Sequence, residues 1–210
     1  MTRAPTPRRW SALERSLESV PPFAHGRPEL EQVATPADAA AQLLRAACDA
    51  DDLVDRAVVD LGAGTGRLAI GAALLGARSV TAVEVDPAAI ALGRRSAEAL
   101  GGPVRWVASD VAAWQGRADT VLMNPPFGAQ RRGADRPFWA AAFATAQRAI
   151  YAFALADSRT FIARRAVERA AYVDATRPVP WALPRVFPHH RRERVALAVD
   201  LWAIRITEPP

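Results

Sequence analysis

The run Asn124-Pro125-Pro126-Phe127 has the clearest chemical use in this chain, and it follows the apolar stretch 120–123. The asparagine side-chain oxygen and the backbone carbonyl of the first proline can both accept hydrogen bonds from one planar amine, because proline fixes φ and has no competing N–H. The aromatic ring beyond them offers a stacking face for a base that carries the amine. The run therefore predicts a clamp for an NH2 group, called here the amine clamp. The alternative is a proline-rich turn, which the asparagine begins and in which the phenylalanine fills the core.

A glycine-rich turn lies between an apolar run and an alanine- and leucine-rich segment. Its sequence is Asp60-Leu61-Gly62-Ala63-Gly64-Thr65-Gly66. Alternate glycines permit positive φ and let a ligand approach the backbone, while the helix expected next presents free N–H groups. A dinucleotide-binding turn would have its third glycine at Arg67. The G-x-G-x-G spacing looks instead like the S-adenosylmethionine turn of class I methyltransferases, so Asp60, Gly62, Gly64 and Gly66 are candidate cofactor-binding residues.

Acidic residues follow the next two predicted strands. Glu84 lies near the end of strand 80–85, where nucleoside-binding folds place a carboxylate for ribose hydroxyls. Asp86 precedes Pro87, so we interpret it as a helix N-cap with proline in the first turn.

Strand 104–108 ends at Asp110 and Val111, a further candidate pair for the cofactor. Asp110 could accept a hydrogen bond from the adenine amine of the cofactor. The alternative is a solvated turn aspartate.

The length and composition fit one globular domain. The chain has 210 residues, of which 50% are hydrophobic, which suffices for a buried core. No apolar run reaches membrane-spanning length and the N-terminus lacks a secretory apolar segment, so we expect a cytoplasmic protein. The single cysteine, Cys48, supplies neither a disulfide framework nor a metal cluster, and no bound metal is predicted.

The positive charge is carried by arginine alone, because the 27 basic residues include no lysine and the formal net charge is +5. Arg131 and Arg132 follow the amine clamp, and a second basic run near the C-terminus includes His190, Arg191 and Arg192. Guanidinium groups suit phosphate contacts and base stacking, so these residues are RNA-binding candidates. The alternative for each run is a solvated loop.

The order of predicted elements indicates an α/β fold. In addition to the strands given above, strands are expected at 149–155, 172–175 and 195–206. Helices are expected over 9–20, from Thr35-Pro36 to 49, over 138–148, and from a cap at 157 or 158 to 171. Residues 178–188 are proline-rich and predict a substrate-facing loop.

Repeated strand-helix units favour a single Rossmann-like class I methyltransferase domain with a mostly parallel seven-stranded sheet, helices on both faces and an antiparallel C-terminal strand. Residues 1–50 would form a helical segment packed on the core, 51–210. The residues Asp60, Glu84, Asp110 and Asn124 then meet at the C-terminal ends of the strands, where ligands bind.

Five segments carry a resemblance to one family. They are Leu30-Glu31-Gln32-Val33-Ala34-Thr35-Pro36, Asp60 to Gly66, residues 70–77, Met123-Asn124-Pro125-Pro126-Phe127-Gly128, and Val199-Asp200-Leu201. Over nearly its whole length the sequence resembles the methyltransferase-like-five family of small-subunit ribosomal RNA adenine methyltransferases.

The resemblance implies roles for several residues. Gln32 and Thr35 would help enclose the methionine end of S-adenosylmethionine, and the amine clamp would hold the target adenine. It also implies a small zinc-containing activator protein that adds to the edge strand 104–108. Phe23 could close the second side of the base, or it could pack beside Pro22.

The chemistry predicted for this site is methylation of the exocyclic amine of an adenine in RNA. Two alternatives stay open. A protein-glutamine N5-methyltransferase uses a similar clamp, since a glutamine amide is also a planar NH2 group, but such enzymes typically have a larger N-terminal domain and a tyrosine at the position of Phe127. A non-catalytic RNA-binding assembly factor could retain the same fold.

Overall fold

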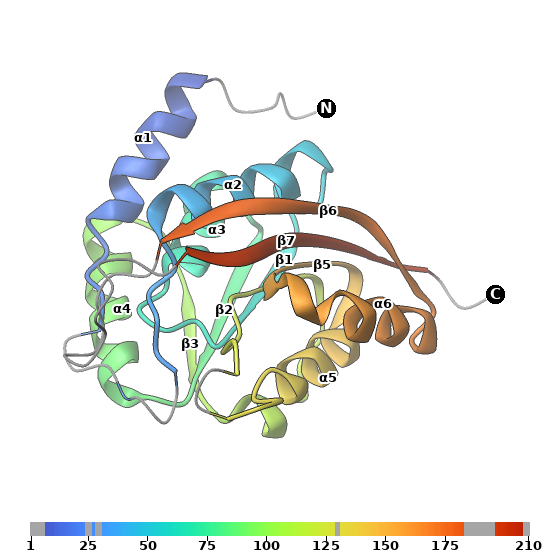
Figure 1. Ribbon diagram of the computed structural model, residues 1–210. Coiled ribbons are helices and arrows are strands. Elements are labelled where there is room, and N and C mark those ends of the chain that lie inside the picture. Colours follow the sequence, from blue (N-terminus) through green and yellow to red (C-terminus); the bar gives the residue numbers. More distant parts are fainter. Residues whose placement is uncertain (1–6, 24–26, 28–30, 129–130, 183–195, 208–210) are drawn as a thin grey trace.

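The computed structural model describes residues 7–23, 27, 31–128, 131–182 and 196–207, in which strands and helices alternate (Figure 1). The helices are α1 (Pro7–Glu18), α2 (Ala37–Asp49), α3 (Arg67–Leu75), α4 (Pro87–Leu100), α5 (Arg136–Thr145) and α6 (Arg159–Glu168). The strands are β1 (Ala57–Leu61), β2 (Ser79–Glu84), β3 (Arg105–Ala108), β4 (Ala118–Met123), β5 (Ala146–Leu155), β6 (Ala171–Ala182) and β7 (Ala196–Ile206). Two short 3-10 helices, η2 (Val111–Ala113) and η3 (Ala156–Ser158), connect them.

The strands form one sheet in the order β3-β2-β1-β4-β5-β7-β6. Strands β1 to β5 are parallel, whereas β7 runs antiparallel to β5 and β6. The central strands β1 and β4 are mostly apolar and almost wholly buried, as expected where helices cover both faces of a parallel sheet. The predicted seven-stranded sheet with its antiparallel C-terminal strand is confirmed.

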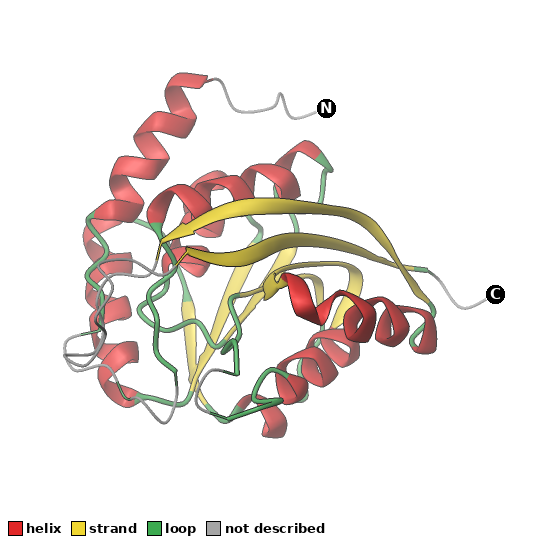
Figure 2. Ribbon diagram, viewed as in Figure 1, coloured by secondary structure: helices red, strands yellow, loops and turns green. Residues whose placement is uncertain are grey.

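Helices cover both faces of this sheet (Figure 2). Helices α2, α3 and α4 lie on one face with α1 packed outside α2 and α3, while α5 and α6 cover the other face. The first core buries Leu17 of α1 and Leu43 of α2 completely, and the second buries Trp139 of α5 and Ile162 of α6. Burying each of these side chains stabilises the fold by roughly 1.5–3 kcal/mol. Helix α1 therefore shares a core with the sheet.

Two helix ends differ from the prediction. Helix α5 begins at Arg136 and ends at Thr145, so residues 146–148 belong to β5 rather than to a helix. Helix α6 ends at Glu168, because Ala170 adopts φ of 49° and the chain turns into β6 one residue later. The predicted boundaries at 148 and 171 are wrong for these local reasons.

Strand β6 is longer than predicted. It runs through Ala182, so Pro178 and Pro180 lie in a strand and not in a loop. Proline lacks the N–H that a central strand needs, but β6 is the outermost strand, and an edge tolerates proline. The rest of the predicted proline-rich loop, residues 183–188, lies outside the described residues.

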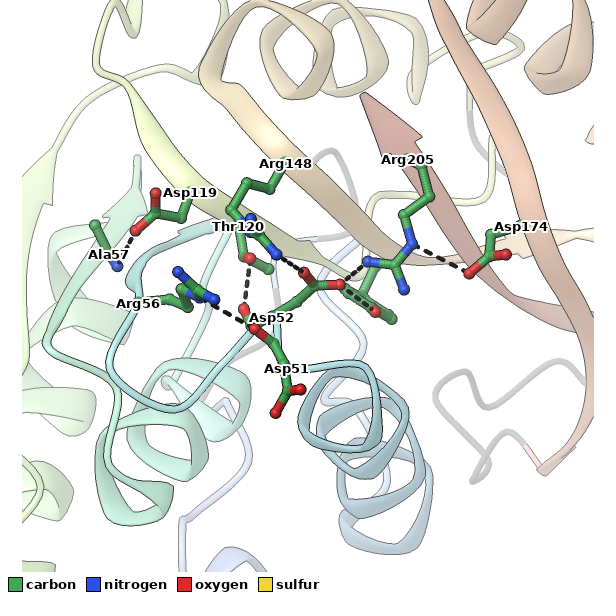
Figure 3. A network of polar contacts seen from close by, with 10 residues as sticks. Asp51, Asp52, Arg56, Ala57, Asp119, Thr120, Arg148, Asp174 and Arg205 are labelled. Carbon is green, nitrogen blue, oxygen red and sulfur yellow. Dashed lines mark hydrogen bonds and ion pairs between the residues drawn. The ribbon is translucent and has the colours of Figure 1, made fainter. Parts of the chain in front are cut away.

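A buried carboxylate, Asp52, ties together the strand ends opposite the glycine turn (Figure 3). Its Oδ2 accepts from the Tyr151 hydroxyl at 2.8 Å and contacts the Arg205 guanidinium, and its Oδ1 accepts from Arg148 at 3.3 Å. The hydroxyl of Thr120 donates to the backbone oxygen of Asp52 at 2.5 Å. Removing one partner from such a network leaves a buried charge, which is strongly destabilising.

The described residues contain no helix with the length and apolarity needed to cross a bilayer. They also contain no group of three or more His, Cys, Asp or Glu side chains that could hold a metal ion. Cys48 is buried in α2, and burial raises the pKa of its thiol to about 11.

Candidate active site

The glycine turn and Asn124 of the amine clamp line one cavity. They follow neighbouring parallel strands, since Leu61 at the end of β1 pairs with Met123 at the end of β4. The space within this cavity, counted together with the open solvent at its mouth, is about 360 Å³. Its walls are Phe23, Val33, Ala34, Thr35, Asp60, Gly62, Ala63, Gly64, Thr65, Arg67, Leu68 and Asn124. Residues from the N-terminal segment, the turn and the clamp therefore meet around one space.

Glycine is required at three positions of the turn, and the last of them, Gly66, is the N-cap of α3 with φ of 92°. Gly62 has φ of 68° and Gly64 has φ of 56°, a region that other residues rarely adopt. A Cβ on Gly64 would lie 2.8 Å from the Phe23 ring, and one on Gly62 would lie 2.5 Å from the Phe138 ring. The two aromatic rings thus pack directly on the turn backbone.

Asp60 presents a buried oxygen without a partner. Its side chain is 1% exposed, Oδ2 accepts from the Ala69 N–H at 2.9 Å, and Oδ1 has no hydrogen-bond partner among the described residues. Burial raises the pKa of this carboxyl to about 7, against the lowering effect of the Ala69 bond, and the charge of Glu84 raises it further. A cationic ligand in the cavity would compensate the buried charge, so the site fits S-adenosylmethionine.

Glu84 supports the glycine turn from the end of β2. Its Oε2 accepts from the Gly64 N–H at 2.7 Å, and its Oε1 accepts from Val85 and Asp86, both at 2.9 Å. One acceptor position on Oε2 is left for a hydroxyl, because each carboxylate oxygen can accept about two hydrogen bonds. The predicted ribose contact of Glu84 stays a prediction, while its hold on Gly64 is a finding.

Gln32 and Asp86 bond to each other. Gln32 Nε2 donates to Asp86 Oδ2 at 2.8 Å, and Gln32 Oε1 accepts from the Arg27 N–H at 2.8 Å. Asp86 Oδ1 accepts from the Ala88 N–H at 3.0 Å, which confirms the predicted N-cap of α4. The Gln32 bond, more than the cap, lowers the pKa of Asp86. Gln32 does not line the cavity, and its predicted cofactor contact stays a prediction.

The amide of Asn124 is anchored on one side only. Its Nδ2 donates to Thr35 Oγ1 at 3.0 Å, whereas its Oδ1 is buried and has no partner among the residues that the structure describes. Helix α2, predicted to start at Thr35-Pro36, has Pro36 as its N-cap residue and no side chain that caps it. The hydroxyl of Thr35 is used instead to hold Asn124.

Arg67 holds the segment that carries Thr35. Its guanidinium donates from Nη1 to the Thr35 backbone oxygen at 2.6 Å and from Nη2 to the Val20 oxygen at 2.9 Å. Burial lowers the pKa of this guanidinium. The two contacts connect the start of α3 to Val20, which follows α1, and to Thr35, which precedes α2.

The residues after Asn124 pack against the protein. Pro125 is buried, Pro126 is half-buried, and the half-buried Phe127 meets Trp181 edge-on with ring centroids 5.6 Å apart. Glu31 accepts from the Gly128 N–H at 2.8 Å and from the Arg131 N–H at 3.2 Å. The clamp is therefore fixed at both ends.

The remaining candidates lie outside the cavity. Asp110 is exposed, and its Oδ1 accepts from the Ala112 N–H at 2.8 Å as the N-cap of η2, while Val111 is buried. Arg131 and Arg132 are exposed in the loop after the clamp. His190, Arg191 and Arg192 lie outside the described residues, so the structure tests nothing about them.

Comparisons with known proteins place this chain in a family. The family model described as the methyltransferase small domain matches residues 33–152. The rRNA N(6)-adenosine-methyltransferase Mettl5 of Drosophila melanogaster is 31% identical, with 92% of this chain and 95% of the relative covered. The chain belongs to the METTL5 family. The zebrafish (Danio rerio) METTL5 protein is also 31% identical over 93% of this chain and 97% of its own length.

A solved structure supports the fold of this METTL5-family chain. The crystal structure of a Pyrococcus horikoshii protein thought to be an RNA methyltransferase is 33% identical and superposes with a TM-score of 0.86. The match covers 95% of this chain and all of that one. The resemblance inferred from the sequence is confirmed.

The sequence did not reveal three residues that build this METTL5-family site. Arg67 was noted only as a non-glycine, Phe138 only as part of a helix, and Trp181 only as part of a proline-rich stretch. Each acts on a residue at least 32 positions away, Thr35, Gly62 and Phe127 respectively. No local pattern in the sequence marks these three residues for such contacts.

Proposed function

We propose that this protein methylates the exocyclic N6 amine of an adenine in small-subunit ribosomal RNA, with S-adenosylmethionine as methyl donor, in the cytoplasm. The observation that carries the proposal is the unpartnered Oδ1 of Asn124, in a side chain that lines the same cavity as Asp60 and the glycine turn. A buried acceptor without a donor is costly, and the NH2 group of an adenine supplies that donor. The sequence similarity to the rRNA adenosine methyltransferases favours RNA as the source of the adenine.

The chain holds the donor at the glycine turn. Asp60 and Glu84 lie at the ends of neighbouring strands, and Gly62 and Gly64 give the turn between β1 and α3 its positive φ angles. S-adenosylmethionine supplies a methyl group on a cationic sulfur. In this proposal Asp60 compensates that positive charge, Glu84 contacts a ribose hydroxyl, and Asp110 and Val111 flank the adenine of the cofactor.

The chain also activates the acceptor amine. The adenine amine is a poor nucleophile because its lone pair is delocalised into the ring. Acceptance by Asn124 Oδ1 and the Pro125 carbonyl favours rehybridisation and stabilises the charge that grows on nitrogen in the transition state. The new N–C bond forms as the S–C bond breaks, and the proton then leaves to water. Orientation alone can supply several kcal/mol of the acceleration.

A radiolabelled methyl assay separates this function from its rivals. The substrates are deproteinised small-subunit RNA, large-subunit RNA and a release-factor protein, each with wild type and Asn124→Ala. The proposal expects label in small-subunit RNA as N6-methyladenosine and none with the variant. Label in the release factor would indicate a glutamine methyltransferase, and label in none of them would favour a binding protein.

We further propose that a small zinc-containing activator protein extends the sheet at β3. This strand pairs only with β2 within the described part of the chain, so its outer side is open for a strand of another protein. The Ser109 N–H bonds to the Glu84 oxygen, and alternate residues of a strand face opposite neighbours, so the Ala108 N–H points away from β2.

The substitution Ala108→Pro tests the activator proposal. It removes one outward N–H and no bond to β2, so it should weaken copurification of the activator and leave the melting temperature of the isolated chain nearly unchanged. A proline substitution elsewhere needs care as a control: Ala88→Pro in α4, for example, would remove the N–H that donates the cap bond to Asp86. Ala112 is exposed in η2, which follows β3, and Ala112→Ser serves as the control. Unchanged copurification of the Ala108→Pro variant would exclude docking on this edge.

A further inference from the structure

Three aromatic side chains form a chain from the core to the amine clamp. The Phe127 and Trp181 rings meet at 5.6 Å with an interplanar angle of 68°, and the Trp181 and Phe153 rings meet at 4.9 Å and 60°. The rings come from the loop after β4, from β6 and from β5. Phe153 is fully buried, Trp181 is 3% exposed and Phe127 is half-buried. The ring of the clamp thus rests on a rigid aromatic support.

The size of the indole, and not its N–H, is what this position uses. The Trp181 Nε1 is buried and has no acceptor among the residues described, although a buried N–H without a partner is unfavourable. A residue without that donor would avoid the cost. Edge-on aromatic pairs have a preferred geometry, so a large ring behind Phe127 restricts the plane in which Phe127 can lie.

The backbone of β6 fixes the indole in turn. Pro178 and Pro180 precede Trp181, and each restricts φ near −65°. Trp181 pairs with Leu197 on β7, and β6 is the outermost strand beyond β7, drawn in orange in Figure 1. The strand places the indole between the core and the clamp.

We propose that Trp181 is a positioning residue, which sets the plane of the Phe127 ring and thereby the stacking face that the clamp offers to the target base. The inference rests on the proposed function, because it assigns the base to the clamp. Trp181 acts through Phe127 and touches neither the cofactor nor the reacting amine.

The matched control is Trp202. This residue lies on the neighbouring strand β7, is 2% exposed, and also has a buried Nε1 without a partner in the described residues. It packs in the second core, on the other face of the sheet from Phe127 and Trp181. The substitutions Trp181→Leu and Trp202→Leu therefore remove equivalent buried rings, and only the first removes the support of the clamp.

The experiment measures methyl transfer to RNA and cofactor affinity for both variants. Trp181→Leu should lower kcat/KM for RNA about tenfold or more, because a small misplacement in an active site is costly. It should leave unchanged the Kd for sinefungin, the cofactor analogue used to measure cofactor affinity. Trp202→Leu should lower the melting temperature similarly but keep wild-type kcat/KM per folded molecule. Trp181→Phe, which retains a ring edge, should recover most of the activity and serves if the leucine variant fails to fold.

A double-mutant cycle with Phe127→Ala decides whether Trp181 acts through Phe127. The proposal expects Trp181→Leu to cause no further loss when Phe127 is already alanine. An equal loss in both backgrounds, or wild-type kcat/KM for Trp181→Leu alone, would overturn it. If the wild type itself transfers no methyl group to RNA, the proposed function fails first, which is a distinct result.

Discussion

Asn124 Nδ2 donates to Thr35 Oγ1 over 3.0 Å, although 89 residues separate the two. This bond occupies the donor side of the amide and leaves Oδ1 for the substrate. Arg67 fixes the backbone oxygen of Thr35 at 2.6 Å, so the orientation of the amide depends on the segment before α2 and on the first residue of α3. In the proposed function Thr35 therefore acts on the chemistry through Asn124.

Replacing Thr35 by valine should impair catalysis more than cofactor binding. Valine keeps the shape but removes the hydroxyl, so the Asn124 amide loses its anchor and kcat should fall about tenfold to a hundredfold, in line with other losses of orientation. Thr35→Ser keeps the hydroxyl and should retain most of the activity. Turnover numbers and sinefungin affinity measured for both variants check this, and equal kcat values for valine and serine would refute the anchor.

Neutralising Asp60 should stabilise the free protein and weaken cofactor binding. The folded-state pKa of about 7 lies above the ordinary value of 3.8, so the carboxyl in the unfolded chain ionises first as the pH rises. The wild type therefore loses stability between about pH 4 and pH 7, on the order of 2–4 kcal/mol. Asp60→Asn lacks this loss and keeps an acceptor for Ala69, so its melting temperature should exceed that of the wild type at pH 7.5 and match it near pH 4.

Calorimetric titration supplies the second half of the Asp60 test. Sinefungin affinity of the wild type should rise as the pH increases through about 7, because the ionised carboxylate favours a cation. Asp60→Asn should show weak and pH-independent binding. The exposed Asp157→Asn is the control and should change neither property. A wild-type affinity that is flat from pH 6 to 8 would exclude Asp60 from the site.

Removing the carboxylate of Glu31 should loosen the loop that follows the clamp. Glu31→Ala deprives the Gly128 and Arg131 N–H groups of their acceptor, so the KM for RNA should rise several-fold while cofactor affinity changes little. Glu31→Gln keeps one acceptor oxygen and should be intermediate. Glu98→Ala, an exposed residue of α4, is the control. Steady-state kinetics measure the effect, and an unchanged KM for Glu31→Ala would contradict it.

The paired substitution Arg131→Gln and Arg132→Gln should reduce the salt dependence of RNA binding. If both guanidinium groups contact phosphates, the slope of log Kd against log salt should fall by between about 1 and 2. Arg117 and Arg169 are exposed. They precede β4 and β6, at the strand ends opposite the amine clamp, so their paired substitution by glutamine is a charge-matched control. Identical slopes for the two double variants would favour the solvated-loop interpretation.

Local sequence patterns predicted those parts of the site that depend on local geometry. The turn around Gly62 and Gly64 and the N-cap at Asp86 follow from a few adjacent residues, and the structure has both. The mostly parallel seven-stranded sheet with its antiparallel C-terminal strand also followed, because repeated strand-helix units favour parallel pairing with right-handed crossovers. The roles assigned to the site residues, and the division of the chain at residue 50, stay predictions.

Long-range partners were not predictable from the sequence. Glu31 holds Gly128 across 97 positions, and no local pattern marks a glutamate for this. From the sequence, the hydroxyl of Thr35 could cap a helix or bond to a distant residue. The structure shows that it bonds to Asn124 and does not cap α2. Pro178 and Pro180 were predicted to lie in a loop. Proline is tolerated in β6 because this strand is the outermost one, and the position of a strand in the sheet is set by the whole fold.

The central claim is that Asn124 grips an adenine amine beside the methyl donor. Its most direct test is mass-spectrometric mapping of small-subunit RNA nucleosides after incubation with S-adenosylmethionine and either wild type or Asn124→Ala, with sinefungin affinity measured in parallel. The account predicts N6-methyladenosine at one position with wild type, at least about a hundredfold less with the variant, and similar affinities for both. Wild-type methylation by Asn124→Ala would contradict it.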